Sequence, residues 1–209
     1  MKNKYLILIV LAFVSTSCTK PYHEYKLSDE TKSWFIDDDK CHFEMQDDNG
    51  IGYSYSIENS YNYMMDESSH FLGVLTDEAH RESCSQNGCS TYNTAILLCA
   101  TAGWGETLNE DDLFSIDFGN ARYGLSMKGD VITPRYCSDV GGVEGMEFKV
   151  EYLDQFWVHD MEYQGVMRLK LVDLSYPQSK FFPTEIYYAK HYGLIQCTLD
   201  DEVSLYRMP

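Results

Sequence analysis

Apolar residues recur at every second position through much of this chain, and this period constrains the fold more than any other feature. Residues 41, 43 and 45 are apolar and alternate with polar neighbours, and residues 51, 53, 55 and 57 repeat the pattern. Between them lies the turn sequence Asp-Asp-Asn-Gly at 47–50. Alternation on both sides of an Asn-Gly turn predicts a β-hairpin with one face in a core.

Further strands follow from the same pattern. Candidates lie at 92–99, 113–118, 122–127, 131–136, 147–152 and 167–171, with two or three short strands in 185–207. Residues 59–91 are polar and Ser-rich, which predicts a long connection with one helical turn near 76–80. Residues 27–35 read as a short helix that Ser28 can cap. We therefore expect a mainly β, antiparallel single domain over 27–209, with one or two short helices.

The N-terminus has the features of an export signal. Lys2 and Lys4 precede ten apolar residues, 5–14, which are too few to span a bilayer but are typical of a signal peptide. The following Ser-Thr-Ser-Cys, ending at Cys18, resembles the lipobox of bacterial lipoproteins. That resemblance implies a signal peptide over 1–17, acylation of Cys18 (palmitate is a typical chain) and a lipidated tether over 18–26. Ser15 stands where Leu is usual, a relaxation that lipoproteins of the Bacteroidota tolerate. The alternative is an ordinary secretory signal cut near Ser17, with Cys18 left free.

The residues after Cys18 bear on localisation. Thr19 follows it, so the Asp that retains lipoproteins in the inner membrane is absent, and so is the acidic run that marks surface export in the Bacteroidota. The resemblance therefore implies an outer-membrane protein that faces the periplasm. No other stretch is apolar and long enough to span a bilayer, so the lipid would be the only membrane anchor.

The C-terminal part shows a second resemblance. Residues 150–171, followed by Ile-Tyr-Tyr-Ala-Lys-His-Tyr-Gly-Leu-Ile at 186–195, resemble small Bacteroidota envelope lipoproteins of unknown function. The shared feature is a pattern of β-hairpins. It implies a curved antiparallel sheet or half-barrel, and it assigns no functional residue.

Six cysteines remain once Cys18 is assigned to lipid, and an even number in an exported chain suggests disulfides. Cys84 and Cys89 enclose Ser-Gln-Asn-Gly, which can turn the chain, so this is the pair we expect to be bonded. Cys41, Cys99, Cys137 and Cys197 either pair or are buried thiols. The spacing does not match a zinc site.

No catalytic motif is present. Phosphate-binding glycine loops, G-x-S-x-G and H-E-x-x-H are absent, and the six histidines are scattered. A nucleophile–base pair such as Cys99 with His159 has no support over many other pairs. The aspartates at 37–39 and 47–48 lack the spacing of a calcium loop and suit hairpin ends. We therefore predict no metal and no cofactor.

The aromatic residues and the net charge of the chain limit the classes of partner that it can bind. One set of residues is a candidate stacking platform for a sugar or a peptide: Tyr53, Tyr55, Tyr61, Tyr63, Trp104 and Trp157. Cross-strand pairing within an antiparallel sheet is the explanation we favour for them. With 16 Lys and Arg against 33 Asp and Glu, the net charge of −17 argues against nucleic-acid binding.

These observations predict a non-enzymatic envelope lipoprotein that binds a partner protein or a ligand. The alternative is a periplasmic hydrolase or thiol enzyme with an unrecognised site. Histidine converging with aspartate or cysteine in one pocket would favour the enzyme. A deep apolar cavity inside the curved sheet would favour a lipid carrier, and an acidic face would favour a basic protein partner.

Overall fold

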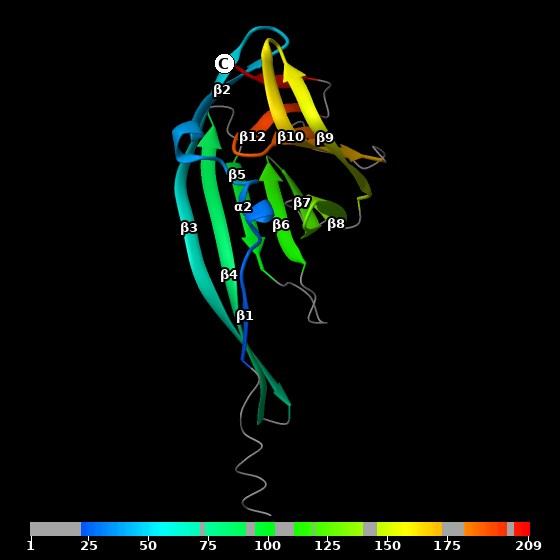
Figure 1. The fold of residues 1–209 in the computed structure, drawn as a ribbon. Helices are drawn as coiled ribbons and strands as arrows, with labels where there is room; N and C mark the ends of the chain where they lie inside the picture. Colours follow the sequence, from blue (N-terminus) through cyan, green and yellow to red (C-terminus); the bar gives the residue numbers. More distant parts are fainter. Residues whose placement is uncertain are drawn as a thin grey trace, which may run out of the picture.

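One large curved sheet dominates the computed structural model (Figure 1). The structure describes residues 22–71, 74–90, 95–102, 111–118, 120–139, 146–172, 182–199 and 203–209. The sheet runs in the order β8-β7-β6-β5-β4-β3-β2-β13-β12-β11-β10-β9, and β8 and β9 at its two ends contact each other. The sheet is thus nearly closed into a barrel-like curve, which confirms the predicted curved antiparallel fold.

The strands are β1 (Tyr22–Tyr25), β2 (His42–Asp47), β3 (Gly52–Phe71), β4 (Val74–Ser90), β5 (Ala95–Thr101), β6 (Asp112–Phe118), β7 (Ala121–Lys128), β8 (Val131–Asp139), β9 (Phe148–Val158), β10 (Met161–Leu171), β11 (Pro183–Ala189), β12 (Gly193–Leu199) and β13 (Ser204–Arg207). The helices are α2 (Asp29–Lys32) and the 3-10 turn η1 (Asp38–Lys40). Among the described residues, no helix is both long enough and apolar enough to cross a membrane.

The hairpins that the alternation predicted are present. Strands β2 and β3 flank the 47–50 turn, and Asp47 shapes this turn by accepting hydrogen bonds from the amides of Asn49 and Ile51 at 2.9 and 2.8 Å. The tail forms β11, β12 and β13 in sequence, as expected. Strand β13 also pairs with β2, so it joins the N-terminal and C-terminal halves of the sheet.

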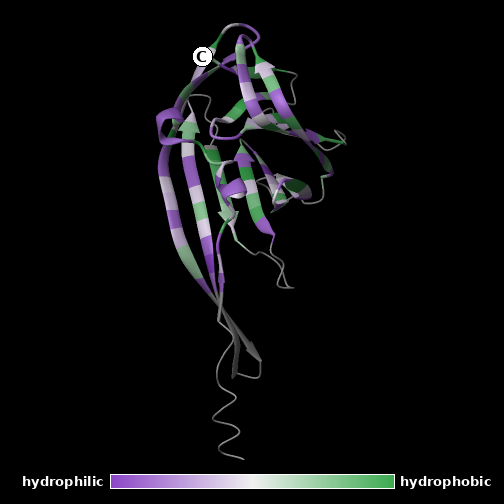
Figure 2. Ribbon diagram, viewed as in Figure 1, coloured by the Kyte–Doolittle hydropathy of each residue, from purple (hydrophilic) through white to green (hydrophobic). Residues whose placement is uncertain are grey.

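The predicted connection over 59–91 is wrong, because these residues form most of one long hairpin. Strand β3 continues to Phe71, and β4 pairs with it from Val74 to Ser90. Figure 2 shows mainly hydrophilic and weakly coloured residues along the coloured part of this hairpin, in contrast to the more hydrophobic β5. A hairpin with so little apolar surface lacks the alternation by which strands are recognised in a sequence.

The Asn-Gly at 87–88, which we expected to turn the chain, lies inside β4. A Cβ atom added to Gly88 would stand 2.2 Å from the carbonyl oxygen of Ser56 on β3. The pairing register shifts at this point, between Ile57 and Asn59. Gly88 therefore permits a close approach of two backbones beside a β-bulge.

A single main core fills the concave side of the sheet. It contains inward-facing residues of most strands, among them Phe114, Tyr123 and Leu205, which are all fully buried. A smaller cluster forms where β9–β12 meet, around Val158, Tyr163, Val166, Ala189 and Ile195.

The segment of residues 27–41, which we call the N-terminal strap, lies inside the curve of the sheet. Leu27, Trp34 and Ile36 are at most 4% exposed and belong to the main core. Ser28 caps α2 by accepting a hydrogen bond from the Thr31 amide, as predicted. The strap therefore occupies space that would otherwise be a cavity in a half-barrel.

Three inward-facing polar side chains hold the strap. Glu82 on β4 accepts hydrogen bonds from the Leu27 amide at 3.0 Å and pairs with Lys32 at 2.9 Å. On β6, Asp112 accepts hydrogen bonds from the strap, including one from the Thr31 hydroxyl at 2.6 Å.

The third is Gln86, whose side-chain amide bonds both backbone groups of Ile36. Its Oε1 accepts from the Ile36 amide and its Nε2 donates to the Ile36 carbonyl, each at 2.8 Å. Opposite, Gly193 (φ 79°) lets the strap approach, because an added Cβ would lie 2.5 Å from Ile36 Cδ1.

Residues 22–25, which we assigned to the tether, instead form β1. This strand pairs with β4 in parallel, and it is the one parallel strand pairing among the described residues. The described part of the sheet thus begins at Tyr22.

Candidate binding site

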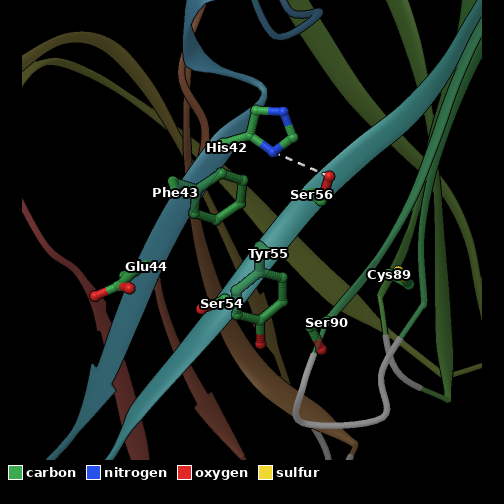
Figure 3. Close-up of a pocket in the computed structure, with 8 residues that line it drawn as sticks. All are labelled: His42, Phe43, Glu44, Ser54, Tyr55, Ser56, Cys89 and Ser90. Atoms are coloured by element: carbon green, nitrogen blue, oxygen red, sulfur yellow. Dashed lines mark hydrogen bonds between the residues drawn. The ribbon is translucent and has the colours of Figure 1, made fainter.

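A row of three polar side chains crosses β2, β3 and β4. His42 lies opposite Ser56, and Ser56 lies opposite Cys89. Phe43 and Tyr55 point to the opposite, buried side of their strands. The His42 Nδ1 and Ser56 Oγ atoms are 3.0 Å apart (Figure 3).

A pocket of about 450 Å³ lies over this row and is open to solvent. Its lining consists of His42, Phe43, Glu44, Ser54, Tyr55, Ser56, Cys89 and Ser90 (Figure 3). The Phe43 and Tyr55 rings stack with centroids 5.2 Å apart in the main core, on the buried side of the strands that carry the pocket. The lining offers three serine hydroxyl groups, an imidazole and one carboxylate, and it has no lysine or arginine.

The serine–histidine pair does not have the arrangement of a catalytic triad. In such a triad, a carboxylate orients the imidazole from the nitrogen opposite the nucleophile. Among the described residues, Ser56 is the hydrogen-bond partner of the His42 ring, and we find no carboxylate bonded to it. Ser56 also lies inside a strand, where its neighbours' amides are used in the ladder with β2.

The neighbouring thiol is not activated either. Cys89 Sγ donates to Glu58 Oε1 at 3.1 Å, and this hydrogen bond raises the pKa of the Cys89 thiol. Burial raises the pKa of the Cys99, Cys84 and Cys41 thiols. Because the thiolate is the nucleophile, a raised pKa lowers reactivity at neutral pH.

The predicted Cys84–Cys89 disulfide is not present, and both thiols are free. The prediction required a turn at Asn-Gly, but both cysteines lie on β4. Five residues of strand separate them by ~16 Å, whereas bonded cysteines need Cα atoms within ~7 Å. The other four described cysteines, Cys41, Cys99, Cys137 and Cys197, are free as well, and Cys137 and Cys197 are buried.

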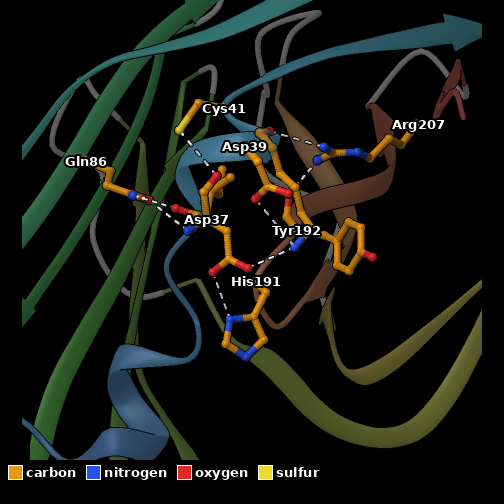
Figure 4. Close-up of polar contacts among 9 residues, drawn as sticks. Asp37, Asp39, Cys41, Gln86, His191, Tyr192 and Arg207 are labelled. Carbon is orange, nitrogen blue, oxygen red and sulfur yellow. Dashed lines mark hydrogen bonds and ion pairs between the residues drawn. The ribbon is translucent and has the colours of Figure 1, made fainter.

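The aspartates at 37–39 lie in a polar network that anchors the strap (Figure 4). Asp37 Oδ2 accepts a hydrogen bond from Lys40 Nζ at 2.8 Å, and its Oδ1 lies 3.0 Å from His191 Nδ1. The hydrogen bond from Lys40 is the main cause that lowers the pKa of Asp37. Arg207 donates to the carbonyl oxygens of Tyr192 and Lys40. These groups fasten the strap to the β11–β12 turn and β13. No cluster of three metal-ligating side chains occurs among the described residues.

The candidate aromatic platform is not assembled. Tyr55 is buried, while Tyr61 and Tyr63 are 55% and 49% exposed further along β3. Tyr53 donates to Asp47 at 3.3 Å, Trp157 lies on β9, and Trp104 is outside the described residues. Tyr61 does line a second, smaller pocket of about 260 Å³, which lies between the strap and the long hairpin.

The other residues that the sequence singled out do not form a site. Cys99 lies on β5 and His159 in the β9–β10 turn, and no interaction between them is found. Cys18 and the expected signal peptide are outside the described residues.

The sequence did not predict that His42, Ser56 and Cys89 form a row across three strands. The alternation did put His42 and Glu44 on one face of a strand, but only the register of three strands brings Ser56 and Cys89 beside them.

Comparisons with known proteins give no assignment: no family model, no curated protein and no solved structure matches this chain.

Proposed function

We propose that the protein is a cell-envelope lipoprotein, held by acyl chains on Cys18, that acts by binding a ligand or partner at the β2–β4 pocket. The observation that supports binding is the chemistry of this pocket. It gathers several hydrogen-bonding side chains on three strands that the core holds from behind, and its serine and cysteine lack an activating environment. Polar groups that converge in a pocket fix the orientation of a ligand and are typical of recognition.

The charge of the pocket indicates the class of ligand. Glu44 contributes a carboxylate to the lining, no cationic side chain balances it there, and the chain carries −17 overall. An anionic ligand would be repelled, whereas a neutral polyhydroxyl compound or a positively charged peptide segment would be accepted. The filled concave side argues against a lipid carrier, because the strap and the core occupy the position of a lipid cavity.

Lipid attachment is supported by the sequence around Cys18 and by the position of β1. Cys18→Ala should move the protein from the membrane fraction to the soluble fraction in its native host. A Cys41→Ala variant is the control, since Cys41 lies within the fold. If the Cys18→Ala protein still sediments with membranes after a salt wash, the anchor proposal is wrong.

Binding is tested by a photo-reactive amino acid placed at Ser54, an exposed pocket residue, in cells that export the protein. Cross-linking to a defined species should disappear when Glu44→Lys is added. The same group at exposed Lys149 on β9 is the control position. Equal cross-linking from both positions would contradict a specific site in the pocket.

The hydrolase or thiol enzyme stays as the second candidate, because His42 and Ser56 are within hydrogen-bonding distance. A fluorophosphonate probe distinguishes it from binding. Covalent labelling of Ser56 that is lost in His42→Ala would show a serine nucleophile and overturn the binding proposal.

A further inference from the structure

Strand β3 is much longer than the strand that pairs with its outer edge. It has 20 residues, and β2 pairs only with residues 52–56. Beyond them the Ile57 amide donates to the Cys41 carbonyl at 2.8 Å, and the chain before Cys41 runs inward as η1 and the strap. Along residues 58–66, no part of the chain that the structure describes pairs with this edge, and β3 forms the margin of the sheet in Figure 1. The sheet therefore has an open row beside β3, in line with β2.

The hydrogen bonds of β4 show which backbone groups of β3 face this open row. The Glu82 carbonyl on β4 accepts from the Ala102 amide, on the β5 side. Successive residues of a strand direct their amides and carbonyls to opposite sides, so the neighbours of Glu82 on β4 bond toward β3. Their register places Tyr61 and Tyr63 in the ladder with β4. The residues of β3 that direct their backbone groups to the open row are then Ser60, Asn62 and Met64.

This edge lacks the features by which exposed edges usually resist pairing. Charged side chains and proline hinder the addition of another strand. The strands at the two ends of the sheet have such residues: Pro134 and Arg135 lie on β8, and Lys149 and Glu151 lie on β9. Residues 59–65 of β3 read Asn-Ser-Tyr-Asn-Tyr-Met-Met, with no charge and no proline. An extended segment can therefore add to β3 through backbone hydrogen bonds.

The second pocket, of about 260 Å³, lies at the same edge. Ser60, Tyr61 and Asn62 of β3 line it together with the half-buried Phe35 of the strap. Asn62 donates to Glu82 at 3.1 Å, so its side chain is on the strap side of the sheet. A side chain of the added strand that lies opposite Asn62 would be on that side as well. It could enter the pocket, where the Phe35 ring suits an apolar group.

The charges around the open row indicate what kind of segment fits. Glu58 and Asp66 lie on either side of the uncharged residues, and both are exposed. At the β2 end of the row, η1 adds the exposed Asp38 and Asp39. A second copy of this chain, paired antiparallel about Asn62, would put Glu58 opposite Asp66. Like charges in that position destabilise a strand pair, whereas lysine or arginine would be attracted.

We propose that residues 59–65 of β3 bind an extended segment of a partner protein that is uncharged in its middle and has lysine or arginine at its ends. The backbone of Ser60, Asn62 and Met64 bonds this segment, and one of its apolar side chains enters the second pocket. A basic end lies beside Glu58. The inference is independent of the anchor at Cys18 and of the β2–β4 pocket.

Amide hydrogen exchange of the purified protein, followed residue by residue by NMR, tests whether the row is open. The Tyr61 and Tyr63 amides should be protected by the ladder with β4, and the Ser60, Asn62 and Met64 amides should exchange faster. Protection of all five amides in a monomer would show that the chain covers its own edge. Protection of all five in a dimer, measured by sedimentation, would make a second copy the occupant. Either result overturns the inference.

Two displayed libraries of short peptides test the chemistry of the partner. Both have random uncharged residues in the middle, and the ends are lysine in one library and glutamate in the other. Binding peptides should come from the lysine library only, and a selected peptide should protect the Ser60, Asn62 and Met64 amides. Met64→Pro removes a donor from the edge and should weaken this peptide by about tenfold or more. Met64→Val keeps the donor and is the matched control.

Glu58→Lys leaves the backbone intact and should weaken the same peptide, so the test does not depend on the folding of the proline variant. Equal yields of binding peptides from the two libraries would contradict the role of charge. Equal affinity of Met64→Pro and Met64→Val, or binding that leaves the three edge amides unprotected, would overturn the inference, as would a lysine library that yields no binding peptide.

Discussion

Replacing Gln86 with alanine should destabilise the domain strongly, because this side chain completes the hydrogen bonding of a buried backbone. Gln86 bonds the amide and the carbonyl of Ile36, and Ile36 is 3% exposed. In Gln86→Ala both groups lose their partner. A buried group left without a hydrogen bond costs ~1–3 kcal/mol, so for two groups the free energy of unfolding should fall by ~2–6 kcal/mol. That is a large part of the ~5–15 kcal/mol typical of a domain.

Asn87→Ala provides the matched control on the same strand. Asn87 faces outward and is exposed, so its replacement should change the free energy of unfolding by less than ~0.5 kcal/mol. Urea unfolding followed by circular dichroism measures both. With a slope of ~2 kcal/mol per molar, Gln86→Ala should lower the urea midpoint by ~1–3 M. Equal midpoints for the two variants would show that the strap is not held by Gln86, and the account of how the concave side is filled would be wrong.

Three further outcomes are expected. Burial raises the pKa of Glu82, but its hydrogen bonds, led by that from Lys32, lower this pKa overall. The ionised Glu82 side chain therefore stabilises the fold fully above pH 4.5, and this stabilisation is lost as the pH falls through the folded-state pKa. When urea midpoints are measured against pH, they should fall less steeply at acid pH in Glu82→Gln than in the parent protein. Deleting residues 202–209 removes β13 and leaves unpaired edges on β2 and β12, so the truncated chain should aggregate or be degraded. A soluble product with an unchanged melting temperature would contradict the role of β13 in joining the two halves of the sheet. Cys89 should react slowly with iodoacetamide in the native protein and faster in Glu58→Gln, because the hydrogen bond to Glu58 raises the pKa of the thiol; identical rates by mass spectrometry would contradict this.

The elements that could be predicted from the sequence are those with one face in the core. The hairpin of β2 and β3 and the tail strands β11–β13 show clean alternation because one side of each packs against apolar residues. Most of β3 and β4 could not be predicted, since their inward face meets the polar groups of the strap. There the buried Glu82 and Gln86 hydrogen-bond the strap, and Asn62 donates to Glu82.

The candidate site needed information that the sequence does not contain. His42, Ser56 and Cys89 become neighbours through the register of three strands, and a slip of one residue would put them on different faces. The disulfide prediction failed for a related reason. An Asn-Gly pair favours a turn locally, but the close approach of Gly88 to Ser56 at a bulge uses the same residue type.

The pairing of β2 with β13 also has a kinetic consequence. Every other antiparallel pair in the sheet joins strands that follow each other in the chain. Because their partners are near in sequence, those pairs can form early in folding. The β2–β13 pair instead brings Asp47 to Leu205, and its loop-closure entropy is the largest in the sheet. Two meanders should therefore appear first during refolding, and their joining should set the slow phase. Until then the edges of β2 and β13 stay open, which is the interval in which the chain is most prone to aggregate.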